Sequence, residues 1–390
     1  MKKKIAILGS TGSIGKTTLR IIEKDKKNFD IKLLSTYSNI KELLKQAELF
    51  KVRNLIVVSE KHYLSLKKKK INKKYNIYNN FSNFNKLFKT KLDYVMASIS
   101  GIKGLEPTNA IIKHTKKIAI ANKETIICAW NIISKELKLH KTEFIPVDSE
   151  HFSIWKLLKD NKKNNISKVY ITASGGPFLN LPKKNFGQIT PKKALKHPNW
   201  KMGKKISIDS ATMMNKVFEL IEAQRIFNIK LNKLNILIHP KSYLHAIVKF
   251  NNGITKLLVH ETNMSIPIFN SIYENEGYII SKEVNFKTLN NLDLSIPDKQ
   301  KFPCLKIIDK ISNEISLLET VLISANDELV RNFLNKKINF SNMYIILNKV
   351  LNLKEYKKLI RFKPKSVVEI LKLDKQVRLK TAELCIKYKR

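Results

Sequence analysis

Long apolar runs and paired cysteines are both missing from this chain of 390 residues. No segment approaches the ~18 consecutive apolar residues that a membrane-spanning helix needs. The basic start Met1–Lys4 is followed by only four apolar residues, Ile5–Leu8, which is too short for the apolar region of a signal peptide. The three cysteines, Cys128, Cys304 and Cys385, lie far apart, which fits a reducing compartment better than a disulfide framework. We therefore expect a cytoplasmic protein that has no membrane segment.

Acidic residues are scarce as well, since 32 Asp and Glu face 74 Lys and Arg, giving a net charge of +42. Such a charge is typical of nucleic-acid-binding proteins, but it also arises when the solvated faces of an enzyme drift toward lysine. The lysines are spread along the chain, in runs such as Lys67–Lys70 and Lys162–Lys163, and form no basic block interleaved with aromatic residues. We expect no specific nucleic-acid partner.

Apolar runs alternate with amphipathic stretches through the first ~146 residues, a pattern that predicts a parallel sheet covered by helices on both faces. The later chain changes from a mixed α+β pattern to a helical one. We therefore predict an α/β protein with an N-terminal Rossmann-like parallel sheet (1–147), an α+β second domain (148–274), and a linker with a C-terminal helical bundle (275–390). The expected N-terminal strands are Lys4–Leu8, Ile31–Thr36, Asn54–Val58, Tyr94–Ala97, Ile118–Ala121 and Glu143–Ile145.

A glycine-rich turn, Gly9–Gly15 (GSTGSIG), connects the first expected strand to a helical pattern. In that context glycines let the backbone approach a dinucleotide diphosphate, and the helix start stabilises its charge. A glycine-rich turn without a ligand is the alternative, because the spacing is GxxGxxG and not GxGxxG. The second strand ends in Ser35 and Thr36 without the carboxylate that would hold an NAD ribose, so NADPH is favoured over NADH.

Carboxylates follow the last strand of the N-terminal half. Asp148 and Glu150 are two residues apart and could face one ion, and Glu219 offers a third oxygen donor. Oxygen ligands without a nearby cysteine suit Mg²⁺ or Mn²⁺. Alternatively, Asp148 or Ser149 caps a helix, and Glu219 is an exposed helical carboxylate. The histidines lack a zinc-binding motif, and we interpret them as ordinary polar or core residues.

Two segments could bind phosphate. The turn Thr172–Phe178 (TASGGPF) leaves a strand with free backbone donors, and Ile208–Lys216 (IDSATMMNK) opens a helix, with Asp209 or Ser210 as its cap. On that helix Asn215 and Lys216 lie one turn before Glu219, so a phosphate donor and a metal ligand could share one face. A capped core helix is the alternative. Between the two segments, Trp200 stands in a loop that could close over a substrate or could simply pack.

Six ordered motifs together resemble the 1-deoxy-D-xylulose 5-phosphate reductoisomerase family of the non-mevalonate isoprenoid pathway. They are Gly9–Gly15 (GSTGSIG), Ala121–Glu124 (ANKE), Pro146–His151 (PVDSEH), Ser174–Phe178 (SGGPF), His197–Trp200 (HPNW) and Ser210–Lys216 (SATMMNK), followed by Glu219. The resemblance covers the whole chain. It implies an NADPH-binding domain, a catalytic domain that binds metal and substrate and through which two subunits pair, and a C-terminal helical domain.

The resemblance also implies residue roles. The metal ligands for Mg²⁺ or Mn²⁺ would be Asp148, Glu150 and Glu219. The cofactor-binding residues would be Thr11, Gly12, Ser13, Ile14, Asn39, Asn122, Glu124 and Gly203. The substrate-binding residues would be Lys123, Ser149, Glu150, Ser174, His197, Trp200, Ser210, Asn215 and Lys216, and the catalytic ones Lys123, Glu150 and His197. One departure stands out: family members usually carry a Gly-basic-Asn turn after the second strand, whereas this chain has Tyr37–Asn39 (YSN) there.

The implied reaction is a rearrangement followed by a reduction. Metal-assisted retro-aldol cleavage and recombination would isomerise 1-deoxy-D-xylulose 5-phosphate, and hydride from NADPH would then give 2-C-methyl-D-erythritol 4-phosphate. Two other interpretations stay open. A semialdehyde dehydrogenase would need an activated cysteine, and Cys128 has no histidine beside it in the sequence. A basic nucleic-acid-binding protein on a degenerate enzyme fold would not need the polar motifs to be intact.

Overall fold

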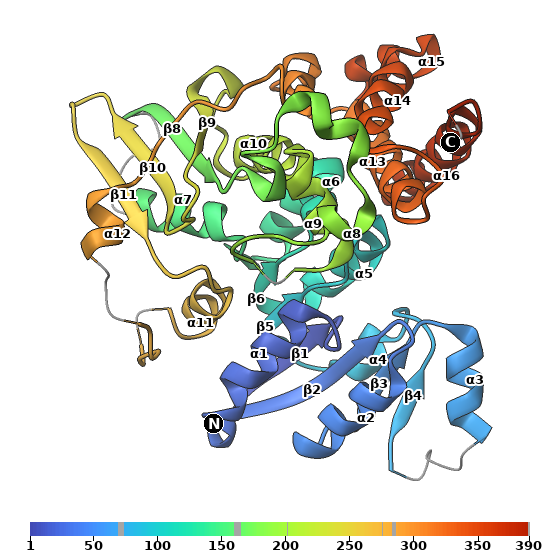
Figure 1. Ribbon diagram of the computed structural model, residues 1–390. Helices are drawn as coiled ribbons and strands as arrows, with labels where there is room; N and C mark the ends of the chain where they lie inside the picture. The colour runs from blue at the N-terminus through green and yellow to red at the C-terminus, as the bar shows by residue number, and fades with distance from the viewer. Residues whose placement is uncertain (69–73, 160–164, 201, 275, 283–285, 389–390) are drawn as a thin grey trace. The chain divides into compact units, whose positions relative to one another are not determined.

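The computed structural model describes residues 1–68, 74–159, 165–200, 202–274, 276–282 and 286–388 (Figure 1). It divides into two compact units. The first comprises Met1–Thr125, Ile133–Asp148 and Met264–Ile279, and the second comprises Ile126–Ile132, Ser149–Asn263 and Ile280–Arg390. Parts of the lysine runs, at positions 69–70 and 162–163, lie outside the described residues, as does position 201 in the loop that carries Trp200.

The first unit contains a seven-stranded, fully parallel sheet in the order β4-β3-β2-β1-β5-β6-β7. Successive strands are added on one side of β1 as far as β4, and from β5 onward on its other side. In such sheets ligands bind at the carboxyl ends of the strands near this switch in strand order. The predicted Rossmann-like sheet is confirmed. Its strands are β1 Lys3–Leu8, β2 Phe29–Thr36, β3 Asn54–Val57, β4 Asn76–Tyr78, β5 Leu92–Ala97, β6 Thr115–Ile120 and β7 Glu143–Pro146.

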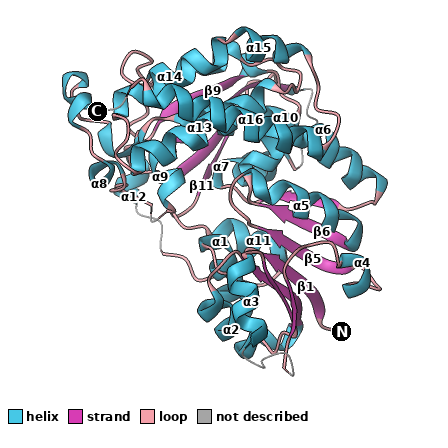
Figure 2. Ribbon diagram, turned by 90° about the vertical axis from the view of Figure 1, so that its right-hand side faces the viewer, coloured by secondary structure: helices cyan, strands magenta, loops and turns pink. Residues whose placement is uncertain are grey.

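Helices cover this sheet through apolar faces, and α1 and α11 lie side by side (Figure 2). α11 comes from more than a hundred residues after the last strand, yet its Ile268 and Ile272 are buried in the same core as Ile5 and Met96. The Tyr94 hydroxyl is hydrogen-bonded to Ser271 Oγ at 2.7 Å. The helices of this unit are α1 Ser13–Glu23, α2 Ile40–Leu49, α3 Glu60–Lys68, α4 Phe84–Leu87, α5 Leu105–Ile111 and α11 Ser265–Tyr273. The residues of α6 Lys123–Leu139 are divided between the two units.

The second unit is built on a mixed sheet in the order β11-β10-β8-β9. The strands are β8 Ile166–Ala173, β9 Leu234–Ile238, β10 Leu244–Phe250 and β11 Thr255–Val259. β8 and β9 run parallel, and the other pairs are antiparallel. Ile154 and Leu157 of α7 (Ser149–Leu158) and Leu220 and Ala223 of α10 (Met214–Phe227) pack in its core. α7 carries Glu150 and α10 carries Glu219, and Asp148 directly precedes α7 in the sequence.

The C-terminal part of this unit is helical, as predicted. Figure 1 shows α13, α14 and α16 packed together at the orange-to-red end of the chain. The remaining helices of the unit are α8 Pro191–Ala194, α9 Lys204–Ala211, α12 Phe286–Asn290, α13 Leu318–Leu334, α14 Phe340–Asn352, α15 Lys354–Lys357 and α16 Val367–Ile386. Among the described residues, no helix has both the length and the apolar character needed to cross a membrane.

Candidate functional site

The turn after β1 needs glycine at two of its three glycine positions. Gly9 has a φ of +84°, and a Cβ there would lie 2.8 Å from the Ser98 carbonyl oxygen. A Cβ on Gly15 would lie 2.5 Å from the Gly9 oxygen, so α1 packs against the turn only without a side chain there. Gly12 is different: a Cβ there would come no closer than 3.4 Å to the Gly9 oxygen. The fold therefore does not require a glycine at position 12. We infer that a ligand, and not the packing of the protein, is the reason for a glycine there.

Gly12 is the N-cap of α1, and both Gly12 and Ser13 are exposed. No acidic residue stands in the first turn of α1, and the N-cap offers no side-chain hydrogen bond. The N–H groups of that first turn and the positive end of the helix dipole together form a site for an anion. The predicted cofactor residues Thr11–Ile14 thus lie at a helix start that fits a diphosphate.

Polar residues at the end of β2 hold this turn in place. Ser35 Oγ accepts from the Gly9 N–H at 2.8 Å, and the Thr11 and Thr36 hydroxyls are hydrogen-bonded at 2.7 Å. Thr36 Oγ1 also accepts from the Asn39 N–H at 3.2 Å, and the Asn39 side chain caps α2. Ser35 and Thr36 are buried, so their polarity serves the turn itself, and Asn39 is placed beside it.

Asn122 and Glu124 stand at the start of α6, after β6, and both are buried. The Asn122 side chain accepts from the Thr125 N–H at 2.7 Å and donates to the carbonyls of Gly101, at 2.7 Å, and Ile99. Its amide is therefore used to fix the loop that follows β5. The last predicted cofactor residue, Gly203, belongs to the second unit, where it is the N-cap of α9.

The three predicted metal ligands come together. Asp148, Glu150 and Glu219 each offer a carboxylate oxygen, and these oxygens all lie within 4.8 Å of one another. Glu150 is 8% exposed and Glu219 only 2%, so the alternative of an exposed helical carboxylate at position 219 is wrong. Glu219 lies on α10, the helix that begins at Met214. Its carboxylate oxygens contact Asn215 and Lys216, one turn earlier, as the spacing predicted.

Two lysines balance this carboxylate group only in part. The Lys216 ammonium contacts Glu150 at 2.6 Å and also pairs with Glu219, and Lys123 pairs with Asp148. Burial lowers the pKa of Lys216, but the two carboxylates outweigh that effect and hold the pKa above its ordinary value. Three carboxylates against two ammonium groups leave one net negative charge in a mostly buried site. All-oxygen donors of that charge fit Mg²⁺ or Mn²⁺.

Ser174 and His197 form an ordered hydrogen-bond network. The His197 Nδ1 accepts from the N–H groups of Asn199, at 3.1 Å, and Trp200, at 3.0 Å, so the ring proton is assigned to Nε2, which lies 3.1 Å from Ser174 Oγ. Ser174 Oγ also accepts from the Gly176 N–H at 3.1 Å. The serine proton is then left to donate to an anion. Burial, and secondarily the charge of Lys216, lowers the pKa of His197 to about 4.

Ser210 lies beside this turn, but it is not at a helix start. Gly176, with a φ of +68°, packs so closely on Ser210 that a Cβ would lie 2.8 Å from the Ser210 carbonyl oxygen. The prediction that Asp209 or Ser210 caps a helix is wrong, because both stand in the last turn of α9. The helical conformation is interrupted at Met213, whose φ is +64°, and α10 begins at Met214. The polar segment therefore spans two helices, with Ser210 at the end of one and Asn215 at the start of the next.

The loop with Trp200 is tied to the second unit's sheet. Asn199 Nδ2 donates to the Pro240 carbonyl at 2.5 Å and to Ser242 Oγ at 2.9 Å. The Trp200 ring meets His245 edge-on at 6.3 Å, and His245 is stacked on His260 at 3.7 Å. His245 is buried and His260 is half-buried. Trp200 packs in this arrangement, and a closing motion stays a prediction.

The role of His151 and Glu222 had no clear signal in the sequence. The His151 ring is fully buried, with Nε2 2.9 Å from the Glu219 carbonyl oxygen and Nδ1 3.3 Å from Glu222. His151 thereby fixes the backbone of the helical turn that carries Glu219. The sequence offered two hints: His151 ends the motif Pro146–His151, and Glu222 stands at i+3 from Glu219.

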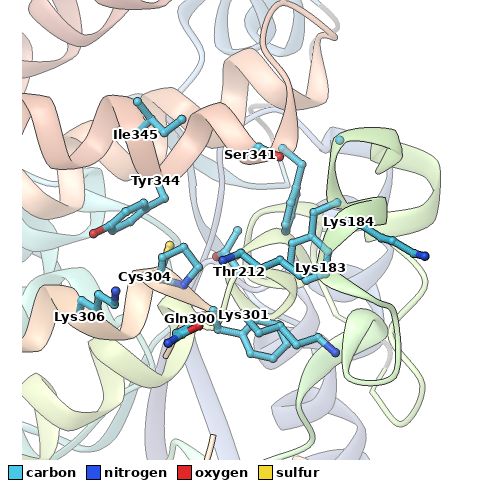
Figure 3. A pocket seen from close by; sticks show the side chains of 15 residues that line it. Lys183, Lys184, Thr212, Gln300, Lys301, Cys304, Lys306, Ser341, Tyr344 and Ile345 are labelled. Carbon is cyan, nitrogen blue, oxygen red and sulfur yellow. The ribbon is translucent and has the colours of Figure 1, made fainter. Parts of the chain in front are cut away.

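A separate cavity of about 630 Å³ lies in the second unit (Figure 3). Its walls include the apolar side chains of Phe302 and Phe340 and the ends of Lys183 and Lys306. Among the lining residues, Thr212 is the closest in sequence to the predicted phosphate-binding residues. No predicted site residue belongs to the lining, as far as the described residues go, so this cavity is not the site described above.

Comparison with known families agrees with this geometry. Three family models match the chain: 1-deoxy-D-xylulose 5-phosphate reductoisomerase over residues 5–130, its C-terminal domain over 144–227, and the DXP reductoisomerase C-terminal domain over 260–380. The reductoisomerase of Pelagibacter ubique is 58% identical over 98% of this chain and 100% of its own length. That of Persephonella marina is 38% identical over 91% of this chain and 92% of its own length.

Solved structures are similar along the whole chain. A crystal structure of DOX-P reductoisomerase in complex with NADPH, fosmidomycin and magnesium has a TM-score of 0.90 and 32% identity, covering 99% of this chain and 98% of that one. The reductoisomerase from Zymomonas mobilis in complex with NADPH has a TM-score of 0.87 and 29% identity, with 99% of each chain covered. The chain belongs to the 1-deoxy-D-xylulose 5-phosphate reductoisomerase family.

Proposed function

We propose that this protein converts 1-deoxy-D-xylulose 5-phosphate to 2-C-methyl-D-erythritol 4-phosphate, using NADPH and Mg²⁺ or Mn²⁺, in isoprenoid precursor synthesis. The observation that carries the proposal is the convergence of Asp148, Glu150 and Glu219 oxygens within 4.8 Å of one another. Family membership and the NADPH and magnesium complexes of similar reductoisomerases support it. Both rival interpretations, a semialdehyde dehydrogenase and a degenerate nucleic-acid-binding protein, lose their basis with that membership.

The chain's own groups would bind the substrate phosphate at one end. Ser174 has a hydroxyl proton to donate, Ser210 packs against the same glycine turn, and Asn215 stands in the first turn of α10. Lys216 forms ion pairs with Glu150 and Glu219. It would be available to the phosphate once these carboxylates bind a divalent ion. His197, neutral at physiological pH, would orient Ser174. Binding the phosphate firmly would keep the fragments of a carbon–carbon cleavage together until they rejoin.

The polar part of the substrate would meet Lys123, Ser149 and Glu150. A bound divalent ion supplies Lewis-acid stabilisation of negative charge on the substrate oxygens, and NADPH supplies the hydride. Ser149 Oγ donates to Glu150, which orients that carboxylate. Lys123 pairs with Asp148, and Glu150 supplies one of the three converging oxygens, so we propose that these two ionisable groups hold and move the protons of the rearrangement. Trp200 would exclude water over the bound substrate.

The test is NADPH oxidation in the presence of 1-deoxy-D-xylulose 5-phosphate, followed by absorbance with and without Mg²⁺. We expect turnover that EDTA abolishes and Mg²⁺ or Mn²⁺ restores. In Glu219→Gln, turnover should fall by at least about a hundredfold while NADPH binding persists. Turnover that is insensitive to EDTA, or a fully active Glu219→Gln, would exclude the metal-assisted reaction.

We also propose that the protein is a cytoplasmic homodimer. β11 is an edge strand of the second unit's sheet, and it exposes Leu257 and Val259, 46% and 38% of their surface. An exposed apolar edge strand favours pairing with a second strand. All three cysteines are buried and none of them forms a disulfide, which supports a reducing compartment. The division into nucleotide-binding (1–147), catalytic (148–274) and helical (275–390) domains is likewise our proposal.

A further inference from the structure

The end of β2 lacks a cation where NADPH selection requires one. In nucleotide-binding sheets of this type the ribose of the adenosine lies at the carboxyl end of the second strand, and a nearby cation accommodates a 2′-phosphate. Here the residues after β2 are Tyr37, Ser38 and Asn39, all uncharged at neutral pH. Ser35 and Thr36 are buried in hydrogen bonds that hold the glycine turn. A 2′-phosphate must therefore find its counter-charge on another element.

Lys103 brings a cation to this place from the other side of β1. It stands in the short 3₁₀ turn Ile102–Gly104 after β5, and its Nζ lies 5.7 Å from the centroid of the Tyr37 ring. The sheet order β2-β1-β5 puts two strand spacings, roughly 10 Å, between the ends of β2 and β5. The Lys103–Tyr37 contact thus spans the carboxyl end of β1, directly where the glycine turn begins.

The loop that carries Lys103 has a fixed backbone. Asn122 donates to the Gly101 carbonyl at 2.7 Å, and Ser98 Oγ donates to the Leu8 carbonyl at 2.8 Å. Gly104 is packed so tightly that a Cβ would lie 2.5 Å from the Ile99 carbonyl oxygen. Only the lysine side chain is exposed and can adjust. Within the described part of the chain, the Lys103 ammonium has no carboxylate at salt-bridge distance, and its contact is the face of a tyrosine that is 61% exposed.

We propose that Lys103 is the cationic partner of the NADPH 2′-phosphate and determines the selectivity for NADPH over NADH. Contact with a tyrosine face stabilises an exposed ammonium only weakly, whereas a charge-assisted hydrogen bond to a phosphate stabilises it more strongly. Tyr37 keeps the ammonium over the end of the sheet until the nucleotide arrives. This inference rests on the NADPH site of the proposed function.

Two other lysines stand near the glycine turn. Lys16 on α1 pairs with Glu42 at 3.7 Å. Lys41 stands in the first turn of α2, is exposed, and follows the same β2 end along the chain. Lys41 is therefore the rival cation, and it also supplies a matched control, because removing it changes the net charge by the same amount.

The test measures dissociation constants for NADPH and NADH by nucleotide fluorescence, without substrate. Lys103→Gln should weaken NADPH binding about tenfold and leave NADH binding within about twofold, as expected for loss of a hydrogen bond to a charged group. Lys103→Arg should keep the selectivity, and Lys41→Gln should change neither constant by more than about twofold. Adenosine 2′,5′-bisphosphate should compete less well against Lys103→Gln in the same proportion.

An unchanged NADPH-to-NADH ratio in Lys103→Gln would overturn the proposal, as would an equal loss in Lys41→Gln. Circular dichroism and thermal unfolding check that each exposed-site variant is folded. Failure of the proposed function has a different signature, because it would show as normal, selective NADPH binding without turnover of 1-deoxy-D-xylulose 5-phosphate.

Discussion

At the scale of single residues, His197 links the phosphate-binding serine to the loop of Trp200. Its Nδ1 receives two backbone N–H groups of that loop, and its Nε2–H reaches Ser174. A proton on Nδ1 would break both loop contacts and would add a positive charge near Lys216. Burial and the charge of Lys216 lower the pKa of His197 to about 4, so the ring stays neutral and keeps both loop contacts at neutral pH.

That pKa predicts how stability depends on pH. The unfolded chain takes up a proton at His197 near pH 6.5, and the folded chain does so only near pH 4, so the unfolded state binds more protons between these values. The contribution of His197 to the free energy of unfolding should therefore be constant above about pH 6.5 and should fall as pH drops toward 4. Urea unfolding across this range should show a smaller fall in His197→Asn, which keeps an acceptor but does not titrate. Parallel curves for the two proteins would contradict the assignment.

At the scale of elements, two positions of the same turn, 12 and 15, are occupied by glycine for different physical reasons. A Cβ on Gly15 would stand 2.5 Å from backbone atoms of Gly9 and Ser10, whereas one on Gly12 would make only ordinary contact. Gly15 is needed for packing α1 on the turn. Gly12 leaves the helix start open to a diphosphate.

Alanine substitutions should separate these reasons. Gly15→Ala should lower the free energy of unfolding by about 1–3 kcal/mol, because backbone atoms must move apart. Gly12→Ala should stay within about 0.5 kcal/mol of the parent chain but should bind NADPH more weakly, since the added methyl group would stand at the helix start that we propose binds the diphosphate. Denaturant unfolding and fluorescence titration measure the two effects. Equal stabilities, or unimpaired NADPH binding in Gly12→Ala, would refute the distinction.

Much of this element structure was predictable from sequence, and the failures have physical causes. Short apolar runs predicted the strands of the first sheet, because its central strands are buried on both faces. A helical pattern predicted the C-terminal helices, such as α16, which buries one face. The break at Met213 was not predictable, since a methionine rarely adopts a positive φ and nothing in Ser210–Lys216 resembles a turn. The short strand β4 was missed because its apolar pattern is only three residues long. The packing of α11 on the first sheet depends on contacts distant in sequence, to which local patterns are blind.

At the scale of the whole molecule, the exposed edge of the second sheet should determine the oligomeric state. β11 alternates inward and outward side chains, and Leu257 and Val259 face outward. Leu257→Asp should convert a dimer to a monomer in sedimentation velocity, because a charge would be buried against the second strand. Leu139→Asp is the matched control, since Leu139 is 65% exposed at the end of α6. A monomeric parent chain, or a dimer that survives Leu257→Asp, would show that this edge is not the interface.

The convergence of three acidic side chains on one divalent ion is best tested by diffraction from crystals grown with Mn²⁺. Anomalous scattering should place one ion about 2.0–2.4 Å from an oxygen of each of Asp148, Glu150 and Glu219, and crystals of Glu219→Gln should lose that peak. An anomalous peak bound elsewhere, or no peak in crystals saturated with Mn²⁺, would contradict the account.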